Sequence, residues 1–443
     1  MSEQVNSDLM SKVVALCKRR GIIFQSSEIY GGINGFWDYG PNGAPLRRNI
    51  EQLWWRHMVE MRDNVVGIES TIICHPRVWH ASGHVEQFCD MMIDCMECKR
   101  RYRSDQLENP NQCPDCGSKK MTEPREFNLM MKTYVGPVFD EEHAAYLRAE
   151  SCQPIFVNFN TVRNTSRQKI PFGIAQTGKA FRNEINPRFF TFRSREFTQM
   201  EMEFFCREEE SMEWYEYWRG ERWKFYTREL GIAEDKLRWK PHENLAHYAK
   251  AAVDIEYLFP FGWGEIEGIH HRGTYDMMRH AEYSGQEQDC KVFDQETRES
   301  YYPTVVETSC GLDRICLMML CDAYHEDLAE TRKEGMDEDE RVVMRFPANV
   351  APVQVAILPL SKKLSEPAGK LRELLSLCFR TDFDDAGSIG RRYRRQDEVG
   401  TPFCVTYDFD SQDDGCVTVR DRDSMEQERI AVNELTVWLL DKL

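Results

Sequence analysis

The sequence predicts an α+β fold in two domains: an antiparallel β-sheet domain flanked by helices over residues 1–346, and a smaller α/β domain over residues 347–443. Between residues 154 and 206, extended apolar runs alternate with polar turns, a pattern that is typical of an antiparallel sheet. After Pro347 the pattern changes to strand, helix, strand, which indicates an α/β unit. A chain of 443 residues is also longer than one hydrophobic core usually supports.

Composition and charge exclude several classes of protein. The chain has 41% hydrophobic and 30% charged residues, which excludes a disordered or fibrous protein. No apolar run approaches the ~20 residues that a membrane helix needs, and Glu3, Asp8 and Lys12 stand where a secretion signal would be apolar. We therefore expect a cytoplasmic protein with no membrane contact. The net charge of −17 argues against a uniformly basic surface but leaves room for local basic grooves.

The spacing of apolar residues and the positions of glycines predict the helices, turns and strand before residue 100. Helical spacing over residues 8–20 stops at Gly21, and the glycine-rich stretch 30–43 indicates tight turns. Residues 45–62 predict a long helix, and a strand over residues 70–74 is expected to stop at Pro76.

The rest of the first domain is expected to be mainly sheet. The expected strands cover residues 155–159, 172–176, 179–182, 196–205, 254–259, 264–270 and 304–310. Helical material fills residues 207–252, and an amphipathic helix follows at 311–324. The charged stretch 325–345 indicates a linker or exposed insertion. In the second domain we expect strands at 353–358, 404–408 and 416–420, and helices at 365–377 and 425–441.

Two neighbouring segments place charged side chains on one face of the expected sheet. Arg182 and Glu184 are two residues apart, and the returning segment alternates in the same way from Phe197 to Glu203. Side chains two residues apart in a strand point to the same side. Taken alone, such a pair is most simply a cross-strand ion pair.

A third segment changes that interpretation. It reads Glu307-Thr308-Ser309-Cys310-Gly311-Leu312-Asp313-Arg314, a strand that enters a helix through glycine. The segments resemble motif 2 (about 180–205) and motif 3 (about 304–324) of the class II aminoacyl-tRNA synthetases. Helix 45–62 with its strand resembles motif 1 (about 45–76), the dimer interface of that class. The resemblance implies a class II catalytic domain, a C-terminal anticodon-binding domain and a homodimer.

The resemblance narrows to the glycyl-tRNA synthetase family of the dimeric α2 type. The segments that carry it are residues 28–32, 36–41, 54–55, 81–84, 127–130 and 387–398. It implies a ligase that activates glycine with ATP to glycyl-adenylate and transfers the glycyl group to the 3′ end of tRNA-Gly. Mg²⁺ would accompany the ATP.

Joining two anions requires cations at the site rather than a nucleophile or a general base. The resemblance implies that Arg182 bridges the carboxylate and the α-phosphate, that Arg314 holds the γ-phosphate and that Glu184 completes the catalytic set. It places Phe197 against adenine and Mg²⁺ on Glu265 and Glu307. The implied ATP-binding residues are Arg182, Asn183, Glu184, Phe192, Arg193, Ser194, Arg195, Glu196, Phe197, Glu265, Ile266, Gly311, Leu312, Asp313 and Arg314. For Arg314 the alternative is an ordinary ion pair with Asp313 or a neighbour.

Glycine offers only its ammonium and its small size for recognition. The resemblance implies an acidic pocket of Glu150, Glu201 and Glu307, whose like charges raise one another's pKa. The implied glycine-binding residues are Arg103, Glu150, Phe197, Thr198, Gln199, Met200, Glu201, Glu307, Thr308, Ser309, Cys310 and Gly311. For Arg103 the alternative to a role in the substrate site is a solvated arginine of the zinc ribbon.

Several positions differ from the family pattern beside this pocket. The family usually has proline at the positions of Ala149 and Thr308, Thr-Ala in place of Ser151-Cys152, and glycine in place of Pro154. These differences bear on the rigidity of the pocket and on turnover more than on the identity of the substrate.

The cysteines indicate one metal site. Cys95-x-x-Cys98 and Cys113-x-x-Cys116 form two pairs 14 residues apart, which predicts a structural Zn²⁺ ribbon inserted at about 95–120. A ribbon that folds without metal is the alternative. The other cysteines are scattered through the chain, as expected for buried thiols in a reducing compartment.

The run Arg391-Arg392-Tyr393-Arg394-Arg395 is a local basic patch in an acidic chain. It indicates contact with nucleic acid, or else arginines that pair with Asp384, Asp385 or Asp397. Two other functions stay open: a non-catalytic binding protein on the same fold, and an enzyme that adenylates a carboxylate for another acceptor. The arginines of motifs 2 and 3 argue against the first, and the basic C-terminal domain argues against the second.

Overall fold

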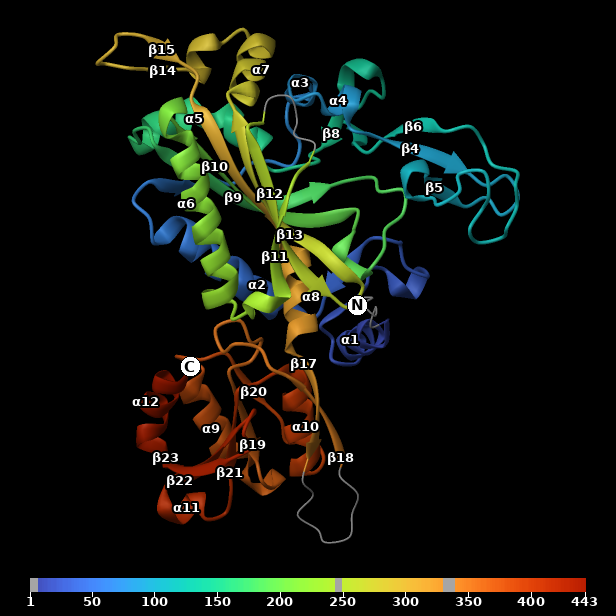
Figure 1. The fold of residues 1–443 in the computed structure, drawn as a ribbon. Helices are drawn as coiled ribbons and strands as arrows, with labels where there is room; N and C mark the ends of the chain where they lie inside the picture. Colours follow the sequence, from blue (N-terminus) through green and yellow to red (C-terminus); the bar gives the residue numbers. More distant parts are fainter. Residues whose placement is uncertain (1–6, 244–248, 330–338) are drawn as a thin grey trace.

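The structure is a computed structural model that describes residues 7–243, 249–329 and 339–443. Figure 1 shows a large sheet flanked by helices, a small projection on one side of it, and a separate α/β unit that carries the C-terminus. Within the described ranges, every helix is too short or too polar to span a bilayer.

A seven-stranded sheet forms the centre of the first domain. Its strand order is β11-β12-β13-β16-β10-β9-β3, and only the β3–β9 pair is parallel. The strands are β3 (Val65–Gly67), β9 (Phe172–Phe181), β10 (Glu196–Cys206), β11 (Leu237–Pro241), β12 (Ala251–Phe259), β13 (Gly262–Gly273) and β16 (Thr304–Gly311). The class II fold and its antiparallel sheet are therefore confirmed.

Strand register brings charged residues together on one face of this sheet. Glu201 pairs with Ser309 across β10 and β16, and Glu203 pairs with Glu307. Across β16 and β13, Glu307 pairs with His270. Directly paired residues point to the same side, so these side chains share one face.

Helices cover the sheet. They are α1 (Ser7–Arg19), α2 (Gly43–Trp55), α3 (Pro76–Ala81), α4 (His84–Gln87), α5 (Gln153–Ser166), α6 (Ser211–Lys224), α7 (Tyr275–Ser284) and α8 (Leu312–Ala323). The main core includes α8 and the fully buried Trp54 and Trp218. On α6, Arg222 donates to Glu267 of β13 at 2.6 Å, and both side chains are fully buried.

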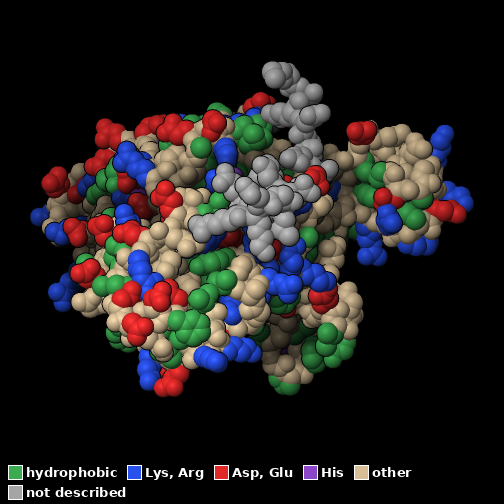
Figure 2. All heavy atoms as spheres, turned by 90° about the horizontal axis from the view of Figure 1, so that it is seen from below, with side chains coloured by type: hydrophobic (Ala, Val, Ile, Leu, Met, Phe, Trp, Pro, Cys, Tyr) green, Lys and Arg blue, Asp and Glu red, His purple; other side chains and the backbone are tan. Residues whose placement is uncertain are grey.

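Small sheets extend from this body. They are β1 (Ile23–Gln25) with β2 (Trp37–Tyr39), β7 (Met131–Tyr134) with β8 (Ala144–Leu147), β14 (Val292–Phe293) with β15 (Ser300–Tyr301), and β17 (Tyr324–Ala329) with β18 (Asp339–Met344). The projection is a three-stranded sheet of β4 (Cys89–Asp94), β5 (Arg101–Arg103) and β6 (Arg125–Asn128). It forms a distinct knob at the edge of the molecule (Figure 2).

The C-terminal unit is a five-stranded sheet with helices and its own core. Its strands are β19 (Val355–Pro359), β20 (Thr381–Phe383), β21 (Phe403–Tyr407), β22 (Cys416–Asp421) and β23 (Gln427–Ala431), and its helices are α9 (Ser365–Leu375), α10 (Ile389–Val399), α11 (Ser411–Asp414) and α12 (Val432–Lys442). β19 runs parallel to both β20 and β21. Acidic and basic side chains are interspersed on the face that Figure 2 shows.

Buried polar contacts join the two units. Asp397 of α10 accepts from Arg341 of β18 at 2.8 Å and from Arg420 of β22 at 2.9 Å. Asn49 of α2 donates to the carbonyls of Val350 and Ala351 at 3.1 and 3.0 Å. The segment between the units is therefore fixed at both ends.

Two expected strands are wrong. Residues 155–159 lie in α5, because Pro154 starts a helix whose apolar positions Ile155, Phe156 and Phe159 all pack into one core cluster. The strand expected at 70–74 lies earlier, at β3, and the polar segment after it keeps only an isolated bridge from Ile73 to Leu147.

Three further expectations need correction. The helical stretch 207–252 is interrupted by β11, and its residues 244–248 lie outside the described residues. The charged stretch 325–345 includes most of the β17–β18 hairpin, not a linker, although residues 330–338 are not described. The helix expected from 425 begins only at Val432, because the polar residues after β22 form a turn into β23.

Candidate active site

A cavity of about 370 Å³ lies against the charged face of the seven-stranded sheet. The sequence predicted most of its lining: Glu150, Arg182, Glu184, Phe192, Arg193, Ser194, Phe197, Gln199, Glu201, Glu265, Glu307, Ser309, Cys310, Gly311, Asp313 and Arg314. It did not predict Thr191, His242, Ala249, Ala252, His270 and Arg272, which also line the cavity.

The carboxyl group of Glu201 accepts four hydrogen bonds. Its Oε2 accepts from the backbone N–H of Ser151 at 2.9 Å and from the Ser151 hydroxyl at 2.5 Å. Its Oε1 accepts from the hydroxyl of Ser309 at 2.6 Å and from the Gln199 amide at 2.9 Å. All four bonds come from uncharged donors, so they fix the carboxyl group without supplying a positive charge.

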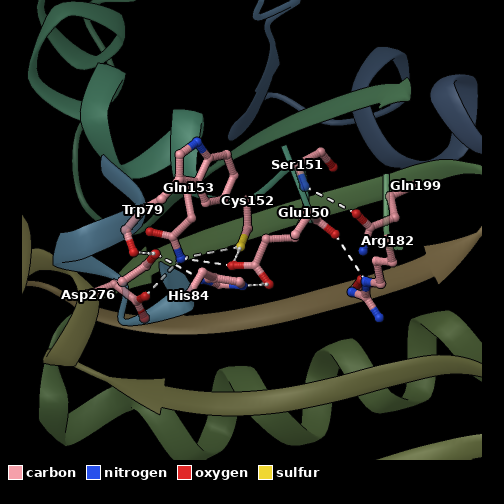
Figure 3. Close-up of polar contacts among 12 residues, drawn as sticks. Trp79, His84, Glu150, Ser151, Cys152, Gln153, Arg182, Gln199 and Asp276 are labelled. Atoms are coloured by element: carbon pink, nitrogen blue, oxygen red, sulfur yellow. Dashed lines mark hydrogen bonds and ion pairs between the residues drawn. The ribbon is translucent and has the colours of Figure 1, made fainter. Parts of the chain in front are cut away.

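Glu150 stands at the turn between β8 and α5. It accepts from Gln153 at 2.9 Å and from the thiol of Cys152 at 3.0 Å, and its other oxygen lies 3.3 Å from Nε2 of His84 (Figure 3). Burial opposes its ionisation, but the charge of His84 lowers the pKa of Glu150 well below its usual range. His84 reaches the site from the turn between α3 and α4, which sequence spacing alone does not reveal.

Glu307 is paired with two side chains of β13, the guanidinium of Arg272 and the imidazole of His270. Its Oε2 accepts from Arg272 and its Oε1 contacts Nδ1 of His270, both at 2.6 Å. Burial acts against ionisation, yet Arg272 and then His270 lower the pKa of Glu307 to about 2. Alternation along β13 from Glu265 would not have pointed to position 270, because the strand has an extra residue, Ile266, between Glu265 and Glu267 that shifts the register.

Two glutamates of β10 lack such cations. Burial, followed by the charges of Glu307 and Glu150, raises the pKa of Glu201 to about 7. Glu203 is fully buried, and among the described residues neither of its carboxyl oxygens has a hydrogen-bond partner. Burial and the charge of Glu307 raise the pKa of Glu203 well above its usual range, so this side chain is neutral in the folded protein.

Two arginines are fixed at the cavity. Arg182 donates through Nε to the carbonyl of Ala149 at 3.1 Å, and its guanidinium lies 5.4 and 5.3 Å from the ring centres of Phe88 and Phe197. Arg314 donates through Nε to the Phe192 carbonyl at 3.1 Å. It also forms an ion pair with Glu265 at 3.2 Å.

Asp313 is engaged in the fold. Its two oxygens accept from the Tyr39 hydroxyl at 2.7 Å and from the backbone N–H of Thr198 at 2.6 Å. These contacts join the N-terminal hairpin, β10 and the start of α8.

Other residues of the expected ATP and glycine sets lie outside the lining: Arg103, Asn183, Arg195, Glu196, Thr198, Met200, Ile266, Thr308 and Leu312. Thr198 and Met200 alternate with Gln199 and Glu201 and so point to the opposite face of β10. Arg103 belongs to β5 of the projection, where it pairs with Asp90 at 3.0 Å and Asp105 at 2.8 Å.

The four cysteines of the projection converge. Sγ of Cys95 lies 3.6 Å from that of Cys116, and the Cys98 and Cys113 sulfurs are also 3.6 Å apart. All four lie within 4.8 Å of one another. A tetrahedral shell with ~2.3 Å bonds separates sulfurs by about 3.8 Å, so the cluster can hold a metal ion such as Zn²⁺.

The basic run of α10 divides into different environments. Arg391 is exposed, whereas Arg392 is only 3% exposed and donates to the Gly387 carbonyl at 2.8 Å. Arg395 donates to Asp384 at 2.7 Å. Arg392 therefore supports the fold, and the salt-bridged alternative holds for Arg395.

Comparison with known proteins agrees with this geometry. Residues 134–324 match the family model described as the tRNA synthetase class II core domain (G, H, P, S and T), and residues 354–442 match the anticodon binding domain. The chain is 53% identical to a glycine--tRNA ligase of Treponema denticola, over 96% of this chain and 95% of the relative. It is 50% identical to one of Borreliella burgdorferi (97% and 96%) and 49% identical to one of Acetivibrio thermocellus (98% of each).

The raised pKa of Glu201 predicts a pH dependence of stability. An unfolded glutamate loses its proton near pH 4.5, whereas Glu201 keeps it to about pH 7, so the folded state binds more protons between these values. The free energy of unfolding should therefore fall as pH rises through this window, by on the order of 3 kcal/mol from this group. Glu201→Gln should remove that part of the fall, measured by urea unfolding at about pH 5 and pH 8.

Glu196→Gln is the matched control, because Glu196 lies on the same strand at the surface. It should keep the parent's pH dependence. An equal fall in stability for the parent and Glu201→Gln would contradict the assignment.

Proposed function

This chain belongs to the glycine--tRNA ligase family, and we propose that its cavity is where glycine is joined to ATP and then passed to tRNA. The protein is an ATP-dependent aminoacyl-tRNA ligase with a class II core and an anticodon-binding domain. Relatives that match at nearly full length leave no support for a non-catalytic scaffold or for another acceptor. We also propose a domain division near residue 346, between the two matched segments.

One observation carries the assignment of the site: two fixed guanidinium groups and a set of buried carboxylates line the same cavity. In the activation step the glycine carboxylate attacks the α-phosphate of ATP, the new C–O–P linkage forms, and pyrophosphate leaves. Both reactants are anions, so the barrier falls when fixed positive charge faces the reacting oxygens. Arg182 supplies that charge at the α-phosphate, and Arg314 holds the γ-phosphate.

The two arginines suit these roles because they are already oriented. The Ala149 carbonyl and two aromatic rings fix Arg182, while Phe192 and Glu265 fix Arg314. Little reorganisation is then needed when charge develops. The Phe197 ring, on the cavity side of β10, would lie against adenine.

The glycine ammonium would be received by the acidic pocket of Glu150 and Glu201, with Ser309 beside them. Glu201 is the group most responsive to a cation, because its own contacts are uncharged donors and its pKa is about 7. A bound ammonium stabilises its ionised form. Larger amino acids would be excluded by the residues that hold Glu201, since Ser151 and Gln199 fill the space around it.

Mg²⁺ is used with ATP by class II synthetases, and Glu265 fits this ion better than Glu307 does. Only one oxygen of Glu265 faces Arg314, and its side chain is 48% exposed. Both oxygens of Glu307 are occupied by Arg272 and His270. Glu265 would therefore hold Mg²⁺ together with phosphate oxygens, and the ion would offset the charge of the polyphosphate.

Three further proposals concern the cysteine cluster, the oligomeric state and the cellular location of the protein. The four-cysteine cluster would hold a structural Zn²⁺, because four thiolates leave no open position. The helix α2, which matches motif 1, would form the interface of a homodimer. The tRNA substrate would place the protein in the cytoplasm.

Arg182→Ala should lower glycine-dependent ATP–pyrophosphate exchange by about 1,000-fold, because it removes a fixed charge at the transition state. Lys179→Ala is the matched control on β9: Lys179 is exposed, pairs with Glu196 and lies outside the cavity lining, so exchange should stay near the parent rate. Exchange by Arg182→Ala within tenfold of the parent would refute the role of Arg182.

Purified protein should contain about one zinc ion per chain, measured by elemental analysis. Cys98→Ser should lose the ion and loosen the projection, because so small a module depends on its metal. Cys89→Ser should keep it, since Cys89 lies in the same sheet but outside the cluster. Protein purified without chelator and free of zinc would contradict the proposal.

Arg391→Ala should weaken tRNA binding and make its dependence on salt shallower by roughly 0.7–0.9 in the log–log slope, as one phosphate contact is lost. Glycine activation should be unaffected, because Arg391 is in the C-terminal unit. Lys370→Ala, an exposed basic position on α9 of that unit, is the control and should bind tRNA like the parent. An unchanged salt slope in Arg391→Ala would remove this residue from the tRNA contact.

A further inference from the structure

A cluster of two histidines and one aspartate at the cavity is not used by the proposed mechanism. His242 follows β11, Asp254 lies in β12 and His270 lies in β13. A ligand atom from each of the three side chains lies within 4.8 Å of the other two. His242 and His270 also line the cavity.

Strand register explains why the three side chains meet. The His242 N–H donates to the Ala252 carbonyl, and Ala252 pairs with His270 across β12 and β13. Asp254 pairs with Gly268. Asp254 and His270 therefore alternate on one face with two very small residues, Ala252 and Gly268, which leave the space between the large side chains open.

The two small residues are required for this arrangement. A Cβ atom at Gly268 would lie 2.8 Å from Nε2 of His270 and 3.4 Å from Oδ1 of Asp254. The imidazole thus leans over the glycine toward Asp254. Any side chain at position 268 would push it away.

The orientation of His270 suits a metal ligand. Its Nδ1 contacts the Glu307 carboxylate at 2.6 Å, which leaves Nε2 directed at Asp254 and His242. A carboxylate on the far ring nitrogen is the usual means by which proteins orient a ligating histidine and raise its basicity. On the other side, Nε2 of His242 lies 2.9 Å from Oδ2 of Asp254.

Spacing and charge agree with a small cation. Ligand atoms in a tetrahedral shell with bonds of ~2.0–2.1 Å lie about 3.3 Å apart. His242 Nε2 and Asp254 Oδ2 are 2.9 Å apart, and all three ligand atoms lie within 4.8 Å of one another. Asp254 brings a carboxylate to the two imidazoles, so the three side chains offer one negatively charged and two nitrogen ligands to a cation. Two imidazoles and one carboxylate favour Zn²⁺ or Co²⁺ over Mg²⁺, which prefers oxygen ligands.

We propose that His242, Asp254 and His270 form a binding site for one divalent transition-metal ion, with an open coordination position toward the cavity. Three protein ligands leave a tetrahedral ion with one position, as in zinc sites that accept an exogenous ligand. The ligand set stands whether or not the cavity binds ATP. This site is separate from the four-cysteine cluster of the projection.

Titration of the full-length protein with Co²⁺ alone, without ATP, glycine or tRNA, tests the proposal by visible absorption. Binding of one Co²⁺ should give weak ligand-field bands without the intense thiolate charge-transfer band that the cysteine cluster would produce. His242→Ala should weaken this binding at least tenfold. His242 is exposed, so the variant should fold, which circular dichroism verifies.

His143→Ala is the matched control: His143 is also exposed and contacts an aspartate, Asp140, at 2.6 Å, but it has no third ligand. It should bind Co²⁺ like the parent. A parent spectrum with only the thiolate band, or equal Co²⁺ affinity in His242→Ala and the parent, would overturn the proposal. Pyrophosphate exchange by the parent, measured separately, tests the proposed activity and does not depend on this result.

Discussion

Burial of three glutamates on one face of a β-sheet, with a fourth from the neighbouring turn before α5, is the constraint on which the rest of this structure depends. A buried carboxylate is unfavourable by several kcal/mol unless it is neutralised or protonated. Glu307 is neutralised by Arg272 and His270, and Glu150 faces His84. Glu203 has no partner and holds its proton instead. Glu201 lies between these extremes, so it is the member of the set whose charge a ligand can change.

The residues that neutralise these buried glutamates come from distant parts of the chain. His84 comes from the turn between α3 and α4, and Arg272 comes from the end of β13. A one-residue slip between β10 and β16 would turn Glu201 and Glu307 into the hydrophobic core, so the register is strongly specified. Ser151 and Cys152, which differ from the family pattern, also act on these glutamates. The Ser151 hydroxyl donates to Glu201, and the Cys152 thiol donates to Glu150.

The sequence pattern predicted the sheet and the two-domain order, and the resemblance to the glycyl-tRNA synthetase family implied most of the cavity lining. Strand alternation by itself indicated only which charged residues share a face of the sheet. It missed Arg272, His270 and His84, since their roles depend on which strands and turns become neighbours in space. The helix α5 was mistaken for a strand because a short apolar run does not distinguish the two without its packing partners. Arg392 was assigned to the surface because an arginine run gives no sign that one member holds buried carbonyls.

The buried junction around Asp397 has a mechanical consequence. Asp397 is held by arginines from β18 and β22, while Asn49 of α2 holds the segment just before β19. Swinging one unit against the other would separate the buried guanidinium of Arg341 from Asp397 and would break the hydrogen bonds of Asn49, which is unfavourable in a low-dielectric interior. These contacts therefore oppose rotation of one unit against the other. An RNA that contacts both units would have to match the fixed spacing between them as well as the chemistry of each contact surface.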